Sequence, residues 1–203
     1  MPSWVQGAIL AIGFSLGVAL MGVQMATSRY LTPYFGSGIE VWASLISTVM
    51  LSLMAGYYIG GRVADRLPRT DVLGSAVAIA GLFLLAVPPL ATPVLDWTLD
   101  NLGDGVGAVL FAASAIMFVP LTLLSFFSPY AVRLLLADAQ HGGRVAGSVY
   151  SITTIGNIVG TLGTSLYLMP RIGSRDITTL YAGVIIVCGV LLFALRRSAR
   201  VHA

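Results

Sequence analysis

Three polar side chains border or interrupt long apolar stretches of the chain, and they are the first candidates for chemistry. Gln24 lies near the end of the first stretch, Glu40 starts the second, and Asn157 lies within the fifth. If these stretches cross a membrane, polar groups inside them are costly and tend to mark functional sites. Asn157 lies between Gly156 and Gly160, so its amide could bind a ligand or hydrogen-bond a neighbouring helix. Both interpretations stay open.

Charged and aromatic residues surround the turn that follows the first apolar stretch. Arg29 and Glu40 flank this turn and could pair across it, close to Tyr30, Tyr34 and Trp42. A carboxylate beside aromatic faces attracts amines through cation-π contacts. The same residue types also anchor helices at a membrane interface. The cluster is therefore either the mouth of a binding cavity or an interfacial anchor.

The second apolar stretch ends in the segment Gly60-Gly61-Arg62-Val63-Ala64-Asp65-Arg66-Leu67-Pro68-Arg69. A carboxylate and a guanidinium at a helix end can pair with a neighbouring helix in one state and release it in another. We therefore predict a conformational latch made of Gly61, Asp65, Arg66, Arg69 and, from a later loop, Arg144. The alternative is an ordinary arginine-rich loop with an ion pair at the helix end.

The sequence shows no pattern of an enzyme active site or a metal site. Cys188 is the single cysteine, which excludes an intrachain disulfide and argues against a cysteine metal site. His141 and His202 lie outside the apolar stretches, away from any serine that they could activate there. The glycine-rich residues 103–107 connect two apolar stretches, unlike a nucleotide loop that follows a strand. We expect no enzymatic activity, no metal and no cofactor.

The composition is that of a membrane protein. Of 203 residues, 57% are hydrophobic and 9% are charged, against about 25% charged residues in soluble domains. Apolar runs of about 20 residues match a hydrocarbon core of roughly 30 Å, where a helix satisfies its own backbone. We predict one all-α domain over residues 1–203, with six transmembrane helices at about 5–27, 39–61, 72–95, 107–127, 147–169 and 177–195.

All 11 basic residues are arginine, and arginine-rich loops stay in the cytoplasm. With both termini inside, eight arginines are cytoplasmic: Arg62, Arg66, Arg69, Arg133, Arg144, Arg196, Arg197 and Arg200. The three outside are Arg29, Arg171 and Arg175. We expect a multi-pass protein of a bacterial-type inner (plasma) membrane with cytoplasmic termini. The net charge of +3 is scattered and predicts no nucleic-acid partner.

A faint internal repeat relates the second helix to the fifth. An offset of 108 residues places Val41-Trp42 on Val149-Tyr150. Two three-helix units joined in this way would be inverted relative to each other, as in many transporter folds. Close helix approach is expected at three GxxxG pairs, Gly13/Gly17, Gly56/Gly60 and Gly156/Gly160. We expect these pairs to pack within the bundle, with a dimer interface at one of them as the alternative.

The loop after the second helix resembles the signature loop of the major facilitator superfamily. That loop runs glycine, two residues, a small residue, Asp, Arg and further basic residues. The matching positions are Gly61, Ala64, Asp65, Arg66 and Arg69, while Pro68 replaces the usual glycine. The resemblance implies a latch role for this loop and half of a facilitator's usual twelve helices.

A closer resemblance is to the membrane portion of the fused major-facilitator/spermidine synthases. It covers QMATSRYLTPYFGS (24–37) with Val41-Trp42, then PYAVRL (129–134), GRVAG (143–147) and residues 150–163. Members usually continue into a soluble Rossmann-like aminopropyltransferase domain, which the sequence up to Ala203 does not contain. The resemblance suggests a polyamine-like substrate, although we expect the family to carry glutamate at Gln24. Because an amide cannot neutralise a cationic amine as a carboxylate would, the charge of the substrate stays open.

Two functions follow from these features. The first is a half-size, facilitator-like transporter of a small, polyamine-like metabolite, acting as a homodimer that rocks its two three-helix units in the lipid bilayer. Its substrate site would use Gln24, Arg29, Tyr30, Tyr34, Glu40, Trp42 and Asn157. The alternative is a non-catalytic membrane subunit that docks a separately encoded spermidine synthase-like enzyme, a soluble aminopropyltransferase-like protein.

Overall fold

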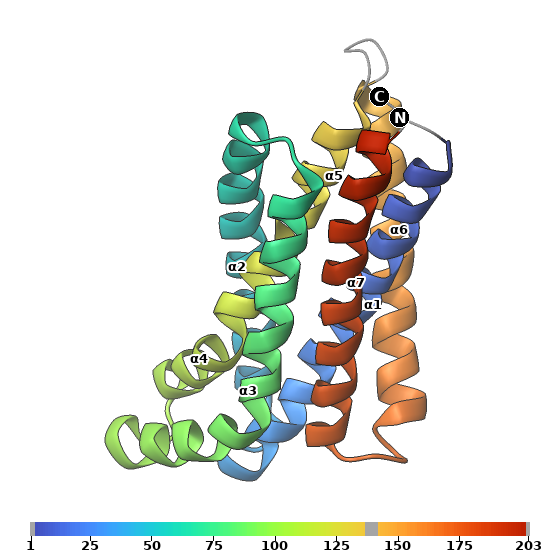
Figure 1. The fold of residues 1–203 in the computed structure, drawn as a ribbon. Helices are drawn as coiled ribbons and strands as arrows, with labels where there is room; N and C mark the ends of the chain where they lie inside the picture. The colour runs from blue at the N-terminus through green and yellow to red at the C-terminus, as the bar shows by residue number, and fades with distance from the viewer. Residues whose placement is uncertain (1–2, 137–141, 202–203) are drawn as a thin grey trace.

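The computed structural model describes residues 3–136 and 142–201 (Figure 1). Within these residues, six helical spans are long and apolar enough to cross a membrane, and no strand occurs. The spans are α1 (Ser3–Phe35), α2 (Ile39–Arg66), α3 (Thr70–Leu102), α4 (Val106–Ser125) continued by α5 (Phe127–Leu135), α6 (Gly142–Gly163) continued by the π-helical turn η2 (Thr164–Leu168), and α7 (Ser174–Val201). The prediction of an all-α, six-helix membrane protein is confirmed.

Several helices extend beyond their predicted ends, and α1 and α3 do so despite the prolines inside them. α1 continues to Phe35 instead of ending near residue 27, and α3 continues to Leu102 instead of residue 95. Gly36 and Gly103 follow these helices with a φ of 74°, which residues with a side chain rarely adopt. The chain between the predicted end of the first helix and Gly36 is therefore helical, and the turn begins at this glycine.

The most extensive contacts in the bundle join spans that are not consecutive. α3 packs along α7, α1 along α6, and α2 along α4 (Figure 1). Exchanging the first three spans with the last three maps the α1–α6 pair onto the α2–α4 pair. The same exchange maps α1–α7 onto α3–α4, and α3–α7 onto itself. Two inverted three-helix units predict this contact pattern.

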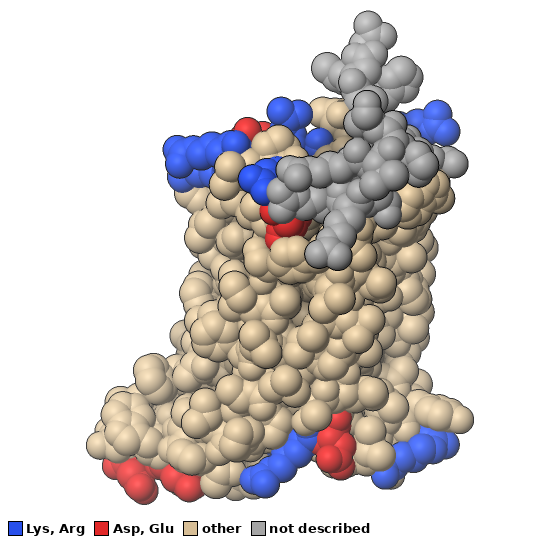
Figure 2. Space-filling model, viewed as in Figure 1, with Lys and Arg blue, Asp and Glu red and all other residues tan. Residues whose placement is uncertain are grey.

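The two ends of the bundle carry the charges. Both termini lie at one end, together with the α2–α3 turn, and we name it the terminal end (Figure 1). The α1–α2, α3–α4 and α6–α7 connections lie at the other end, which we name the loop end. Arginines and acidic residues gather at both ends, and the face in Figure 2 shows an uncharged band between them. A multi-pass protein with its middle in lipid has this distribution.

Glycines set the closest helix crossings. A Cβ added at Gly156 would overlap the carbonyl oxygen of Phe14, and one at Gly160 would overlap that of Val18. A Cβ at Gly56 would lie 2.5 Å from the carbonyl oxygen of Thr122. The GxxxG pairs are therefore used within one chain, between α1 and α6 and between α2 and α4, as expected for packing within the bundle.

Candidate functional site

A small polar cavity lies where α1, α2, the α4–α5 junction and α6 meet. Its volume is about 50 Å³. The polar residues that line it are Tyr57, Ser125, Ser128, Thr153 and Asn157, and the others are Gly13, Leu16, Gly17, Leu20, Leu53, Leu124 and Phe127. The cavity thus draws on helices from both three-helix units, the position at which transporters built from inverted repeats place their substrates.

The sequence positions these side chains through helical spacing. Thr153 and Asn157 are four residues apart on α6 and share one face of that helix. Ser125 and Ser128 flank Phe126, the residue at which α4 passes into α5. On the α1 side, glycines leave room for the amide, and a Cβ at Gly17 would lie 3.1 Å from the side-chain oxygen of Asn157.

Asn157 contributes an amide with free hydrogen-bonding capacity to this cavity, which also holds the hydroxyls of Tyr57 and Ser128. The hydroxyl of Thr153 donates to the carbonyl oxygen of Val149 at 2.9 Å, and that of Ser125 donates to Leu121 at 2.6 Å. In contrast, the side-chain amide of Asn157 makes no hydrogen bond within residues 3–136 and 142–201, and only its backbone oxygen accepts one. A side-chain amide has an NH2 group that donates and a carbonyl oxygen that accepts, so a ligand can accept hydrogen bonds from it and donate one to it.

The structure places two of the predicted substrate residues in the interior. Asn157 lines the cavity, and Gln24 is 6% exposed. Gln24 lies one helical turn beyond Leu20, on the face of α1 that carries Leu20 and Gly17 toward the cavity. Gln24 is thus near the loop-end side of the cavity without being part of its lining.

The structure does not bring the predicted charged and aromatic cluster after the first apolar stretch together into one site. Arg29, Glu40 and Trp42 are exposed, and among the described residues no ion pair joins Arg29 to Glu40. The buried Tyr30 donates from its hydroxyl to the hydroxyl of Thr178 on α7 at 3.4 Å. Tyr34 is half-buried near the end of α1. Tyr30 thus ties the end of α1 to α7.

Two of the predicted latch residues, Asp65 and Arg69, form separate ion pairs at the terminal end. Asp65 faces Arg133 of α5, with 3.4 Å between carboxylate oxygen and guanidinium nitrogen. Arg69 pairs with Asp71 at 2.9 Å, within the start of α3. Gly61 lies beside Pro129, and a Cβ added at Gly61 would lie 3.9 Å from that side chain. The remaining two predicted latch residues, Arg66 and Arg144, are exposed.

The sequence did not reveal that two residues of the fourth span contact the predicted latch segment and the turn that follows it. Arg133 pairs with Asp65, and the buried Tyr130 donates a hydrogen bond to the carbonyl oxygen of Leu67 in the α2–α3 turn. Both residues belong to the PYAVRL segment at 129–134, whose spacing alone does not indicate a contact with that turn. Cavity residues Tyr57 and Thr153 were missed as well, because hydroxyls are common in helices and give no distinctive spacing.

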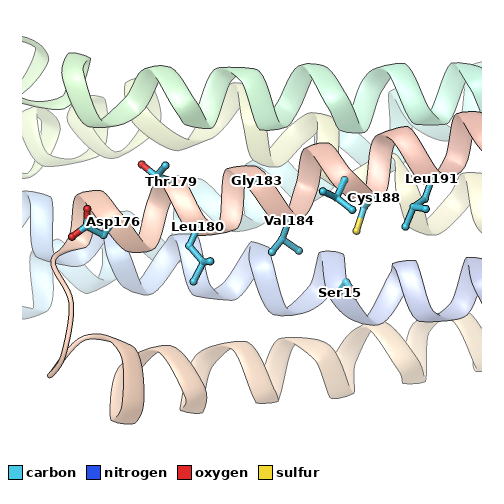
Figure 3. Close-up of a pocket in the computed structure, with 9 residues that line it drawn as sticks. Ser15, Asp176, Thr179, Leu180, Gly183, Val184, Cys188 and Leu191 are labelled. Atoms are coloured by element: carbon cyan, nitrogen blue, oxygen red, sulfur yellow. The ribbon is translucent and has the colours of Figure 1, made fainter.

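A second, larger hollow runs along α7 and differs in chemistry (Figure 3). This groove has a volume of about 600 Å³ and faces α1 at Ser15. Apolar residues such as Leu180, Val184 and Leu191 line most of it, and Asp176 lies toward the loop end of α7. Because it lacks converging polar groups along its length, it suits an apolar chain better than a polar solute.

Comparisons of the chain with protein-family models, with curated proteins and with solved structures find no match. The resemblance to the fused major-facilitator/spermidine synthases therefore stays a prediction that rests on motif residues, chiefly those at 24–37 and 129–134.

Proposed function

We propose that the protein is a half-size, facilitator-like transporter that moves a small polar metabolite across the membrane. The observation that supports this is the polar cavity of about 50 Å³ between helices of both inverted units. In transporters built from inverted repeats, substrates bind near the middle of the membrane between the repeats. Asn157 lies midway along the fifth span and supplies an amide that has no hydrogen-bond partner among the described residues.

Alternating access would require the two three-helix units to make and break contacts at opposite ends of the bundle. At the terminal end, Asp65 of the first unit pairs with Arg133 of the second at 3.4 Å. At the loop end, Tyr30 of the first unit contacts Thr178 of the second at 3.4 Å. Rocking of the units would break one set of contacts while the other holds, giving access from each side in turn.

The proposed working form is a homodimer, with cytoplasmic termini in a bacterial-type inner membrane. α6 has the lowest mean hydropathy of the six spans, yet only 17% of its most apolar stretch is buried, against 39–56% for the others. The least apolar span would therefore be the most exposed to lipid in a monomer. A second copy covering α6 by two-fold symmetry removes this mismatch. The mass of the protein in nanodiscs tests it, and a monomer would contradict it.

Uptake into proteoliposomes tests transport itself. We would measure labelled putrescine and spermidine together with uncharged polyols and urea, in vesicles with the protein and in empty vesicles. Asp65→Asn is expected to reduce saturable uptake by removing the ion pair to Arg133. Asp100→Asn is a matched control, because Asp100 is an exposed carboxylate at the loop end without an ion pair among the described residues.

The alternative of a docking subunit would be favoured if folded protein gave no uptake of any of these solutes. An equal loss in Asp65→Asn and Asp100→Asn would argue against the latch while leaving transport intact.

A further inference from the structure

Each span crosses the membrane without a charged or titratable acidic or basic side chain. Asp, Glu, Lys, Arg and His are all absent from residues 1–28, 41–61, 72–95, 105–132, 145–170 and 177–195. The face in Figure 2 shows the same uncharged band between the two charged ends. Every acid, base and potential counter-ion of the six spans therefore lies near an end of the bundle.

The cavity contains no charged side chain either, because its polar lining consists of hydroxyl groups and one amide. A second copy covering the open side would contribute residues of the same spans and would add no charge at this depth. An ion moved into such a site loses its hydration without gaining a partner of opposite charge, which is strongly unfavourable. A neutral hydrogen-bonding solute exchanges bonds with water for bonds with hydroxyls and an amide at a small net cost.

Coupling to protons would require a group that gains and loses a proton within the membrane. Carboxylates and histidines form such relays in pumps and coupled transporters. The six uncharged intervals of this chain contain neither residue type. The side chains available along the pathway can bind and release a solute, but they cannot carry a proton with it near neutral pH.

We infer that the cavity around Asn157 takes a small uncharged solute of the polyol or amide class and passes it without a coupled proton. This inference rests on the proposed transport function and specifies its substrate class. The cavity volume of about 50 Å³ is room for one or two waters, which sets a small size for the group that Asn157 holds. The inference excludes the polyamines that the family resemblance suggests, because each ammonium group would enter without a counter-ion.

The test compares solutes that differ in charge. Stopped-flow light scattering would follow glycerol and urea entry into proteoliposomes, and labelled putrescine uptake would be measured in the same vesicles. We expect glycerol or urea entry well above that of empty vesicles, no putrescine uptake, and no change on imposing a pH gradient. Loss of one good hydrogen bond in the site corresponds to about a tenfold change, which is the fall expected for Asn157→Leu.

Two threonines provide a matched pair of variants. Thr153 lines the cavity and Thr179 lines the groove along α7, and each hydroxyl donates to its own helix at 2.9 Å. Thr153→Val is expected to slow glycerol and urea entry, whereas Thr179→Val should leave it unchanged. Circular dichroism and gel filtration would confirm that each variant is folded.

The outcomes separate this inference from the transport proposal. Saturable putrescine uptake without entry of the neutral solutes would overturn the inference and leave transport standing. Accumulation of any solute driven by a pH gradient would also overturn it. If folded protein passed neither neutral nor charged solutes, transport and the inference would fail together.

Discussion

The α1–α6 and α2–α4 pairs are equivalent in the inverted arrangement, but they achieve their close contact in different ways. In α1–α6 both helices contribute glycines, Gly17 on one side and Gly156 and Gly160 on the other, each facing a backbone carbonyl. In α2–α4 only α2 does, through Gly56 and Gly60, which face Thr122, Ser125 and Phe126. The two pairs therefore share their geometry and differ in the residues that produce it.

The two pairs also differ in what else holds them. α2 contacts both α4 and α5, and Asp65 near its end pairs with Arg133. α6 packs mainly on α1 and is otherwise largely uncovered. The α1–α6 contact should therefore matter more for keeping α6 in place than the α2–α4 contact matters for α2.

The largest effect is expected at the reciprocal glycine contact. Gly156→Ala and Gly160→Ala place methyl groups in overlap with carbonyl oxygens of α1, where backbone atoms cannot move aside easily. Each overlap should lower the free energy of unfolding by about 1–3 kcal/mol, and the double variant should lose most. Thermal melts in detergent would measure this. Gly163→Ala, with nothing within 4 Å, is the control and should be neutral or slightly stabilising.

A smaller loss is expected in the equivalent pair. Gly56→Ala brings a methyl group to 2.5 Å from both the Thr122 oxygen and the Ser125 side chain. This approach to a carbonyl oxygen is less close than those at Gly156 and Gly160, and α5 continues to hold α2, so the loss should fall toward the lower end of about 1–3 kcal/mol. The matched control is Gly61→Ala, which meets an ordinary contact at 3.9 Å. If Gly56→Ala cost more than Gly160→Ala, the proposed difference between the pairs would be wrong.

Tyr130 and Tyr30 make hydrogen bonds at opposite ends of the bundle, and we expect the two bonds to differ in their contribution to stability. Tyr130→Phe leaves the Leu67 carbonyl without this donor, and we expect a loss of about 1 kcal/mol in unfolding free energy. Tyr30→Phe should cost less, because its bond to Thr178 is long, at 3.4 Å, and Thr178 already donates to Ser174. Urea titration followed by tryptophan fluorescence would rank them, and a larger loss for Tyr30→Phe would contradict the ranking.

The smallest effect is expected at Thr122, beside Gly56. Its hydroxyl oxygen is buried and has no hydrogen-bond partner among the described residues. Thr122→Val keeps the shape and removes the unpaired polar group, so stability should be unchanged or raised by up to about 1 kcal/mol. A clear loss of stability in the same melts would show that this hydroxyl has a partner in the membrane.

The sequence was sufficient for the spans and insufficient for their contacts. Apolar length predicted six helices, but their ends were misplaced where polar residues continued a helix, as in α1 up to Phe35. The glycine pairs were recognised, while their partner helices were not, because a glycine indicates close approach without saying what approaches. Asn157 was a candidate because an amide at membrane depth is rare, and the structure places it in the lining of the cavity. Thr153 and Ser128, which complete the cavity, resemble many other hydroxyls until the helices are packed.

The non-consecutive pairing of the spans has a consequence for biogenesis. Among the six spans α1 is synthesised before the others, but its principal partner α6 is the fifth span, and α3 pairs most extensively with α7, the sixth. Long-range contacts of this kind form only after the intervening chain has been made. We therefore expect the early spans to remain in the bilayer without their principal partners, with the glycine face of α1 open to lipids or to an insertion chaperone. We expect the bundle to assemble only when α6 and α7 have been inserted.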